Sequence, residues 1–167
     1  FEIRFAAFHN SKLFVVSSPT IKDASKIEEQ FEAGDQRRYH VPCPHCEERQ
    51  TLKWSNVRWT VVGQRVTRAW YVCEHCGCEI DEYHKSAMLA GGRWIAENAG
   101  ALYRSYHING LYTPIGIGRS WLQLAQEWIE AQGDPRKLVV FVNTRLAETW
   151  ADRSHDLKPN VLIARAE

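Results

Sequence analysis

The sequence predicts an α+β fold in which a β-rich middle lies between two parts that contain helices. Residues 38–80 are rich in Val and Trp and carry a turn signal at Gly63-Gln64, which is typical of short antiparallel strands. Capping patterns and helical spacing of apolar residues occur before and after this stretch and indicate helices on both sides. Two Cys-x-x-Cys pairs lie at the ends of the β-rich part. A metal held by these pairs would close a unit whose own core is thin.

The first part of the chain is predicted to run strand, polar loop, helix. Residues 12–16 form a short Val-rich run between polar segments, the pattern of a buried strand in a parallel sheet. Ser25 is followed three residues later by Glu28, which predicts a capping box at the start of a helix. Gly34 is placed to end that helix.

The part after the β-rich unit is predicted to be helical. Residues 81–91 indicate a short helix. Ser120 and Gln123 form a second capping box, before apolar residues at helical spacing, and Gly133 would end that helix.

One further helix is predicted close to the end of the chain. Asp134-Pro135 suits an N-cap and the first helical position, although the run at residues 139–142 also suits a strand. Residues 151–167 have the composition of a linker or tail.

Composition and charge are those of an ordinary globular protein. The 167 residues are 44% hydrophobic and 25% charged, with a formal net charge of +1, which argues against a disordered chain. No apolar run approaches the roughly 18 residues of a membrane span, and no signal peptide is apparent, so we expect a soluble, intracellular protein with no membrane partner. Attraction to nucleic acid would have to come from local clusters such as Arg37 and Arg38. Next to Glu32 and Asp35, these two arginines also suit an ordinary solvated face.

Four of the five cysteines have the spacing of a metal site. Cys43-Pro-His-Cys46 and Cys73-Glu-His-Cys76 are separated by 26 residues. A two-residue spacer lets both thiolates of a tight turn face one ion, and four thiolates are a ligand set for structural Zn²⁺. Unconnected reduced pairs and a redox-active pair are the alternatives, but the redox motif needs a βαβ context that this stretch lacks.

Three further side chains lie close to these pairs. His45 and His75 occupy equivalent spacer positions, where strain in the short turn favours a place beside the ion or an exposed position over coordination. Cys78 follows Cys76 by two residues and is interpreted as a bystander thiol, with a role as alternative ligand left open. In the same unit Trp54, Trp59 and Trp70 either cover the thin core or stack on nucleic-acid bases.

Several segments, in one order across about residues 12–152, resemble a known family. They are Val15-Val-Ser-Ser-Pro-Thr20, Ser25-x-Ile-Glu28, residues 34–46, Cys73-x-x-Cys-Gly77 with Gly92-x-Trp94, Gly110-Leu-Tyr-Thr-Pro114, and Phe141-x-Asn-Thr-x-Leu-x-Glu-x-Trp150. Together they resemble the large terminase subunits of lambda-like tailed phages, of the GpA type. Residues 35–46 joined to the last segment are the specific part, and Ala147 departs from the family, which usually has Gly there.

The resemblance implies a central piece of an ATP-driven motor and endonuclease that packages viral DNA into procapsids. It implies a C-terminal strand and helix of a P-loop ATPase domain at residues 1–37, an inserted Cys₄ zinc ribbon at 38–80, a helical part packing back on the ATPase domain at 81–150, and a linker toward a nuclease domain at 151–167. The loop Ser17-Ser18-Pro19-Thr20 resembles the coupling motif that follows Walker B, although these residues also suit a simple strand end. Asn143, Glu148 and Trp150 would cap a helix and pack at the edge of the ATPase domain.

No Gly-x-x-x-x-Gly-Lys-Ser/Thr phosphate loop occurs in the sequence, so the resemblance places it before Phe1 and the nuclease carboxylates after Glu167. We therefore expect the chain alone to hydrolyse neither ATP nor DNA. The intact parent is expected to use ATP and Mg²⁺, to contact double-stranded viral DNA, the small terminase subunit and the portal, to assemble with copies of itself, and to act in the host cytoplasm of a bacterial cell. The alternative from another class is a stand-alone zinc-ribbon module that binds nucleic acid or a protein.

Overall fold

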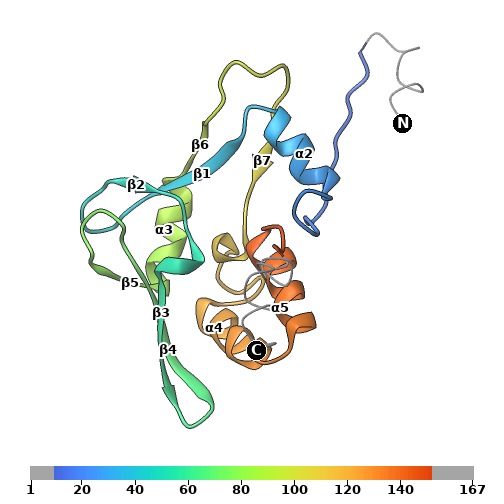
Figure 1. Ribbon diagram of the computed structural model, residues 1–167. Helices are drawn as coiled ribbons and strands as arrows, with labels where there is room; N and C mark the ends of the chain where they lie inside the picture. Colours follow the sequence, from blue (N-terminus) through green and yellow to red (C-terminus); the bar gives the residue numbers. More distant parts are fainter. Residues whose placement is uncertain (1–9, 152–167) are drawn as a thin grey trace, which may run out of the picture.

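The structure is a computed structural model that describes residues 10–151 (Figure 1). Residues 1–9 and the predicted linker, apart from Ala151, lie outside the described residues. The α+β prediction is confirmed, because two small sheets lie beside a group of short helices. None of the described helices is long and apolar enough to cross a membrane.

The first sheet is built around strand β1 (Arg37–Pro42). β1 pairs antiparallel with β2 (Arg49–Gln50) and with β6 (Arg93–Ala96), and it pairs in parallel with β7 (Tyr106–His107). The strand that leads into the first cysteine pair is therefore held by segments from well beyond residue 80.

The second sheet is a meander of β3 (Val57–Val62), β4 (Arg65–Val72) and β5 (Glu79–Asp81). The predicted hairpin turn at Gly63-Gln64 is confirmed, and Gly63 has φ +65°, a value that a residue without Cβ adopts without strain. The β3–β4 hairpin projects from the body of the molecule (Figure 1).

The helices follow the predicted signals at most positions. Ser120 forms the predicted capping box with Gln123 at the start of α4 (Trp121–Ala131). Asp134 caps α5 (Pro135–Phe141), so this segment is a helix and the strand alternative is wrong. A π-helical turn, η4 (Val142–Leu146), continues α5. The remaining elements are α2 (Lys26–Ala33), α3 (Lys85–Ala90), and the 3₁₀ turns η1 (Trp54–Asn56), η2 (Glu82–His84) and η3 (Gly110–Tyr112).

One continuous core joins the two sheets to the helices. The half-buried Trp54 packs against this core, with its ring centroid 5.6 Å from that of Trp59, 5.7 Å from Trp128 and 5.2 Å from Phe141. Trp54 thus contacts β3, α4 and α5, and Trp59 of β3 stacks on it. The largest fully buried side chains of the core are Trp121, Tyr71, Lys85, Leu52, Ile80, Leu111 and Leu124.

Two predictions for the first part of the chain are wrong. Residues 12–16 form no strand, and Phe14 and Val16 are 86% and 77% exposed. An apolar run becomes a strand only where a neighbour takes up its backbone hydrogen bonds, and no described strand lies beside this run. The capping box at Ser25 is also absent: Ser25 Oγ accepts from the Thr20 amide at 3.2 Å, and the Glu28 carboxylate accepts from the Thr149 hydroxyl at 2.7 Å.

Candidate metal centre

The two cysteine pairs lie in two turns of the same construction. Cys43 and Cys46 lie between β1 and β2, and Cys73 and Cys76 lie between β4 and β5. The Cys43 amide donates to the carbonyl five residues later at 2.9 Å, and the Cys73 amide does the same at 3.0 Å.

The same backbone conformation recurs four residues after the first cysteine of each pair. Glu47 has φ +63° and Gly77 has φ +71°, and the amide of each donates to the carbonyl of that cysteine at 3.0 Å. Each sheet therefore presents one preformed knuckle.

The four sulfur atoms of the two knuckles gather in one place. They all lie within 4.8 Å of one another, with 3.9 Å between the Sγ atoms of Cys43 and Cys76 and 3.8 Å between those of Cys46 and Cys73. A tetrahedral Zn²⁺ with bonds to sulfur of about 2.3 Å has its sulfur atoms about 3.8 Å apart. The donor set and its spacing therefore fit a metal of the zinc class.

Neighbouring groups hold the thiols and the turns in place. The amides of His45 and His75 donate to the Sγ atoms of Cys43 and Cys73, each at 3.4 Å. Each imidazole reaches across to the other knuckle, where His45 Nε2 lies 3.0 Å from the Glu79 carbonyl oxygen and His75 Nε2 lies 3.2 Å from that of Arg49. The rings brace the two knuckles against each other, which suits the expectation that they lie beside the ion.

The cluster has a buried side and an exposed side. Cys43 and Cys73 are buried and Cys76 is exposed. Burial raises the pKa of the Cys43 thiol, whereas a hydrogen bond from the Cys78 amide, together with the other thiols, lowers the pKa of Cys76 to about 6. A bound dication would remove the remaining protons, because a coordinating thiol is deprotonated.

Cys78 contributes its backbone to the second knuckle. Its carbonyl accepts the Cys73 amide bond, as the carbonyl of Glu48 does for Cys43, and its exposed side chain is not among the four clustered thiols. The bystander interpretation agrees with this position.

One supporting residue escaped sequence analysis. Gln50 is 1% exposed, and its Oε1 accepts from the Glu74 amide at 2.9 Å, which ties β2 to the second knuckle. The sequence offers one signal for the role of Gln50. Gln50 and Ile80 occupy matching positions, each seven residues after the first cysteine of its pair.

The two arginines for which sequence analysis left open a solvated face or a contact with DNA have carboxylate partners in the fold. Arg37 Nε lies 2.6 Å from Asp35 Oδ2, and Arg38 Nε lies 3.1 Å from Glu97 Oε1. Arg38 Nη1 also lies 3.3 Å from Nδ1 of His107. Contact of Arg37 or Arg38 with DNA phosphates stays a prediction.

The end of the predicted coupling loop lies against Trp150, the last residue of the family-like segment 141–150. The Thr20 carbonyl accepts from the Trp150 amide at 2.9 Å, the Lys22 amide donates to the Trp150 carbonyl at 3.0 Å, and Ile21 pairs with Trp150 in parallel. Pro19 is buried, while Ser17 and Ser18 are exposed. Two segments more than a hundred residues apart thus meet at one point, and the role of the loop stays a prediction.

Comparison with known proteins points in one direction. The profile described as "Phage terminase large subunit gpA, ATPase domain" matches residues 1–94, and "Terminase large subunit gpA, endonuclease domain" matches residues 103–167. The chain is 34% identical over 163 residues to "Terminase, large subunit" of Enterobacteria phage P21, covering 81% of this chain and 24% of that protein.

A second relative agrees with the first. "Terminase, large subunit" of Escherichia phage lambda is 29% identical over 160 residues, covering 80% of this chain and 24% of that protein. The chain thus spans about a quarter of the length of these relatives. No solved structure matches it. Since the ATPase-domain profile alone covers more than half of the sequence, the chain belongs to the phage terminase large subunit gpA family.

Proposed function

We propose that Cys43, Cys46, Cys73 and Cys76 hold one Zn²⁺ as a structural ion. The observation that carries this proposal is the spacing of their sulfur atoms, 3.8 and 3.9 Å for two of the pairs, in a group contributed by two different sheets. Four protein ligands leave no open position for water or substrate, so the ion would stabilise the fold and take no part in catalysis.

Metal content and folding test the zinc proposal on the chain itself. We expect about one zinc per chain by elemental analysis, and loss of fold on Cys43→Ser, because structural zinc contributes on the order of 10 kcal/mol or more to the folding of small domains. Cys78→Ser is the matched control and should keep both the metal and the fold. A metal-free chain with an unchanged fold would overturn the proposal.

We further propose that the complete protein is the large subunit of a viral DNA packaging motor, with an ATPase and an endonuclease. Membership of the gpA family supports this, as does the division of the profile matches into an ATPase part and a nuclease part. In this proposal the zinc unit is a rigid part of the protein between its ATPase and its nuclease. The complete protein binds ATP, Mg²⁺, DNA and the other packaging proteins.

The test uses the full-length protein that contains this chain. Packaging of double-stranded DNA into procapsids, ATP hydrolysis and DNA cutting are measured with the natural sequence and with Cys43→Ser, with Cys78→Ser as control. We expect all three activities in the natural protein. Cys43→Ser should lose packaging, and the control Cys78→Ser should keep it. A natural full-length protein without ATP-dependent DNA packaging would contradict the proposal.

A further inference from the structure

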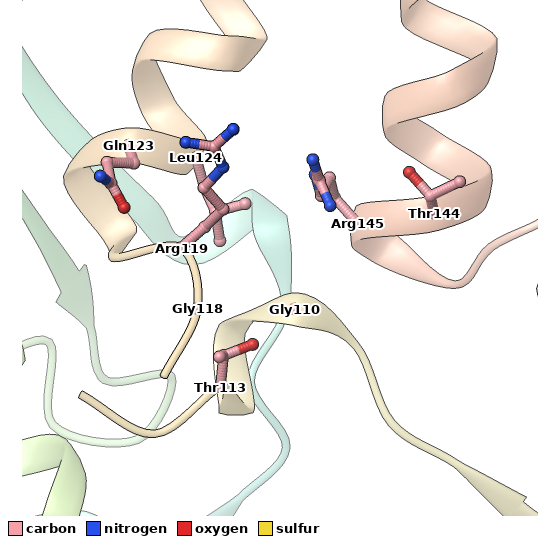
Figure 2. Close-up of a pocket in the computed structure, with 8 residues that line it drawn as sticks. All are labelled: Gly110, Thr113, Gly118, Arg119, Gln123, Leu124, Thr144 and Arg145. Carbon is pink, nitrogen blue, oxygen red and sulfur yellow. The ribbon is translucent and has the colours of Figure 1, made fainter. Parts of the chain in front are cut away.

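A cavity lies beside the start of α4, and two arginines line it. Its volume is about 520 Å³, and Arg119 precedes α4 while Arg145 comes from the π-helical turn η4. Figure 2 shows the two side chains on facing sides of the cavity, with Gly110 and Gly118 at its base.

One carboxylate holds both guanidinium groups. Arg119 Nε lies 2.7 Å from Glu127 Oε1, and Arg145 Nε lies 2.8 Å from Glu127 Oε2. The three side chains carry a net charge of +1. Arg145 Nη2 also lies 3.5 Å from Glu127 Oε1, and Thr113 lines the cavity wall.

The base of the cavity is closely packed. A Cβ atom on Gly110 would lie 2.9 Å from the carbonyl oxygen of Arg145, and one on Gly118 would lie 2.5 Å from the Thr113 methyl carbon. Both contacts are shorter than real Cβ atoms tolerate. Glycine at position 110 therefore lets η3 approach the turn that carries Arg145, and glycine at position 118 lets the residue before Arg119 pack against Thr113.

We propose that this cavity binds a phosphate group between Arg119 and Arg145. Guanidinium groups are planar donors that match phosphate oxygens, and charge-assisted bonds of this kind are among the stronger hydrogen bonds of proteins. Glu127 contacts Nε of Arg119, and it contacts Nε and Nη2 of Arg145, so in this proposal the other terminal N–H groups face the ligand. The phosphate would come from a nucleic-acid backbone or from a free phosphate, and only the first source rests on the function proposed above.

Titration of the ¹⁵N-labelled 167-residue chain with inorganic phosphate tests the proposal. We expect the amide signals of Gly110 and Gly118 to shift in a saturable way. Arg119→Gln should weaken binding roughly tenfold, since a hydrogen bond to a charged group is typically worth about that factor, and it leaves the ion pair of Arg145 with Glu127 in place. Arg136→Gln makes the same charge change on a side chain that is 97% exposed and should leave binding unchanged.

A second variant separates a ligand site from a merely structural ion pair. Glu127→Gln raises the local charge from +1 to +2, so phosphate should bind more tightly, whereas a structural triad would only lose stability. Equal binding by the natural chain, Arg119→Gln and Glu127→Gln overturns the proposal, as does an absence of shifts at Gly110 and Gly118.

A third arm identifies the source of the phosphate. A short labelled DNA duplex is titrated at several salt concentrations, and Arg119→Gln should lower the slope of log K against log[salt] by about one if the cavity meets a backbone phosphate. If phosphate binds and the duplex shows no dependence on Arg119, the site takes a free phosphate. Zinc is measured in the same samples, so a zinc-loaded chain that binds neither ligand contradicts this inference and leaves the zinc proposal standing.

Discussion

At the scale of single residues, Gly92 shows how close backbone approach constrains the sequence. A Cβ atom added there would lie 2.3 Å from the ring of Tyr39, whose hydroxyl donates to the Leu89 carbonyl at 2.7 Å. We expect Gly92→Ala to lower the free energy of unfolding by about 1–3 kcal/mol, the usual cost of overpacking, in a denaturant titration. Gly100→Ala is the control, because nothing lies within 4 Å of its added Cβ, and an equal loss in both variants would contradict this account.

His107 gives a prediction about pH. Its Nδ1 faces Arg38 Nη1 at 3.3 Å and its Nε2 faces the Ala147 carbonyl at 2.9 Å, so the neutral ring accepts at Nδ1 and donates at Nε2. Burial, with Arg38 nearby, lowers the pKa of His107 below its ordinary value of 6.5, against the smaller opposing effects of the Ala147 carbonyl and Glu97. The unfolded chain then binds the proton more readily, so this group contributes stability above pH 6.5 that is lost as the pH falls toward the folded pKa.

The measurement is the free energy of unfolding between pH 7.5 and 5.5 for the natural chain and for His107→Gln. We expect the natural chain to lose more stability over this range than the variant does, because Gln has no proton to gain. A variant that loses as much stability as the natural chain would assign the pH dependence to other groups.

At the scale of elements, the start of α4 depends on its cap. Ser120 Oγ accepts from the Gln123 amide at 3.1 Å, and Gln123 Oε1 accepts from the Ser120 amide at 2.9 Å. Ser120→Ala should lower the unfolding free energy by about 1 kcal/mol, measured by thermal or chemical denaturation. Ser120→Asp should restore most of that loss, and a failure of Asp to do so would show that the cap bond does not account for it.

Sequence patterns over a few residues predict the helix caps and turns, because the hydrogen bonds of these features join residues that are close in the sequence. The caps at Ser120 and Asp134 and the turn at Gly63 rest on contacts within four residues, so the sequence alone identifies them. The pairing of β1 with β6 and β7 joins residues more than fifty positions apart, and no spacing rule reveals it. The capping box expected at Ser25 is absent because its hydroxyl accepts from the amide of Thr20, a residue that distant Trp150 holds in place through the Thr20 carbonyl.

The candidate sites divide in the same way. The four cysteines are visible in the sequence because each knuckle is a local motif, and the structure brings both together. The group formed by Arg119, Glu127 and Arg145 is not visible, because its members come from a loop, a helix and a distant π-turn. Its charges gather only when α4 packs against α5.

At the scale of the whole molecule, the continuous core predicts cooperative unfolding. Val41 and Cys43 of the first sheet, Tyr71 and Ile80 of the second, and Trp121 of α4 belong to one buried cluster. The buried Lys85 of α3 forms an ion pair with Glu82 of η2, the turn that follows β5. Glu82 Oε1 also accepts from the Trp121 amide at 3.0 Å, which ties this part of the chain to α4. The sheets and helices therefore have little stability apart from one another.

Calorimetry with and without a zinc chelator tests this cooperativity. We expect a single heat-absorption peak in the metal-loaded chain and a shift of the whole peak to lower temperature on chelation, because a ligand that binds only the folded state stabilises all of it. Two separate peaks, of which the chelator moves only one, would contradict the continuous core.

The pairing of Thr20 and Lys22 with Trp150 has a mechanical consequence. The two segments run in the same direction, so tension applied before residue 20 and after residue 150 would pull them past each other. Both hydrogen bonds, at 2.9 and 3.0 Å, would then resist together in shear. These two hydrogen bonds close residues 23–149 into a loop. Force would therefore pass directly from one paired segment to the other, without stretching the cysteine knuckles.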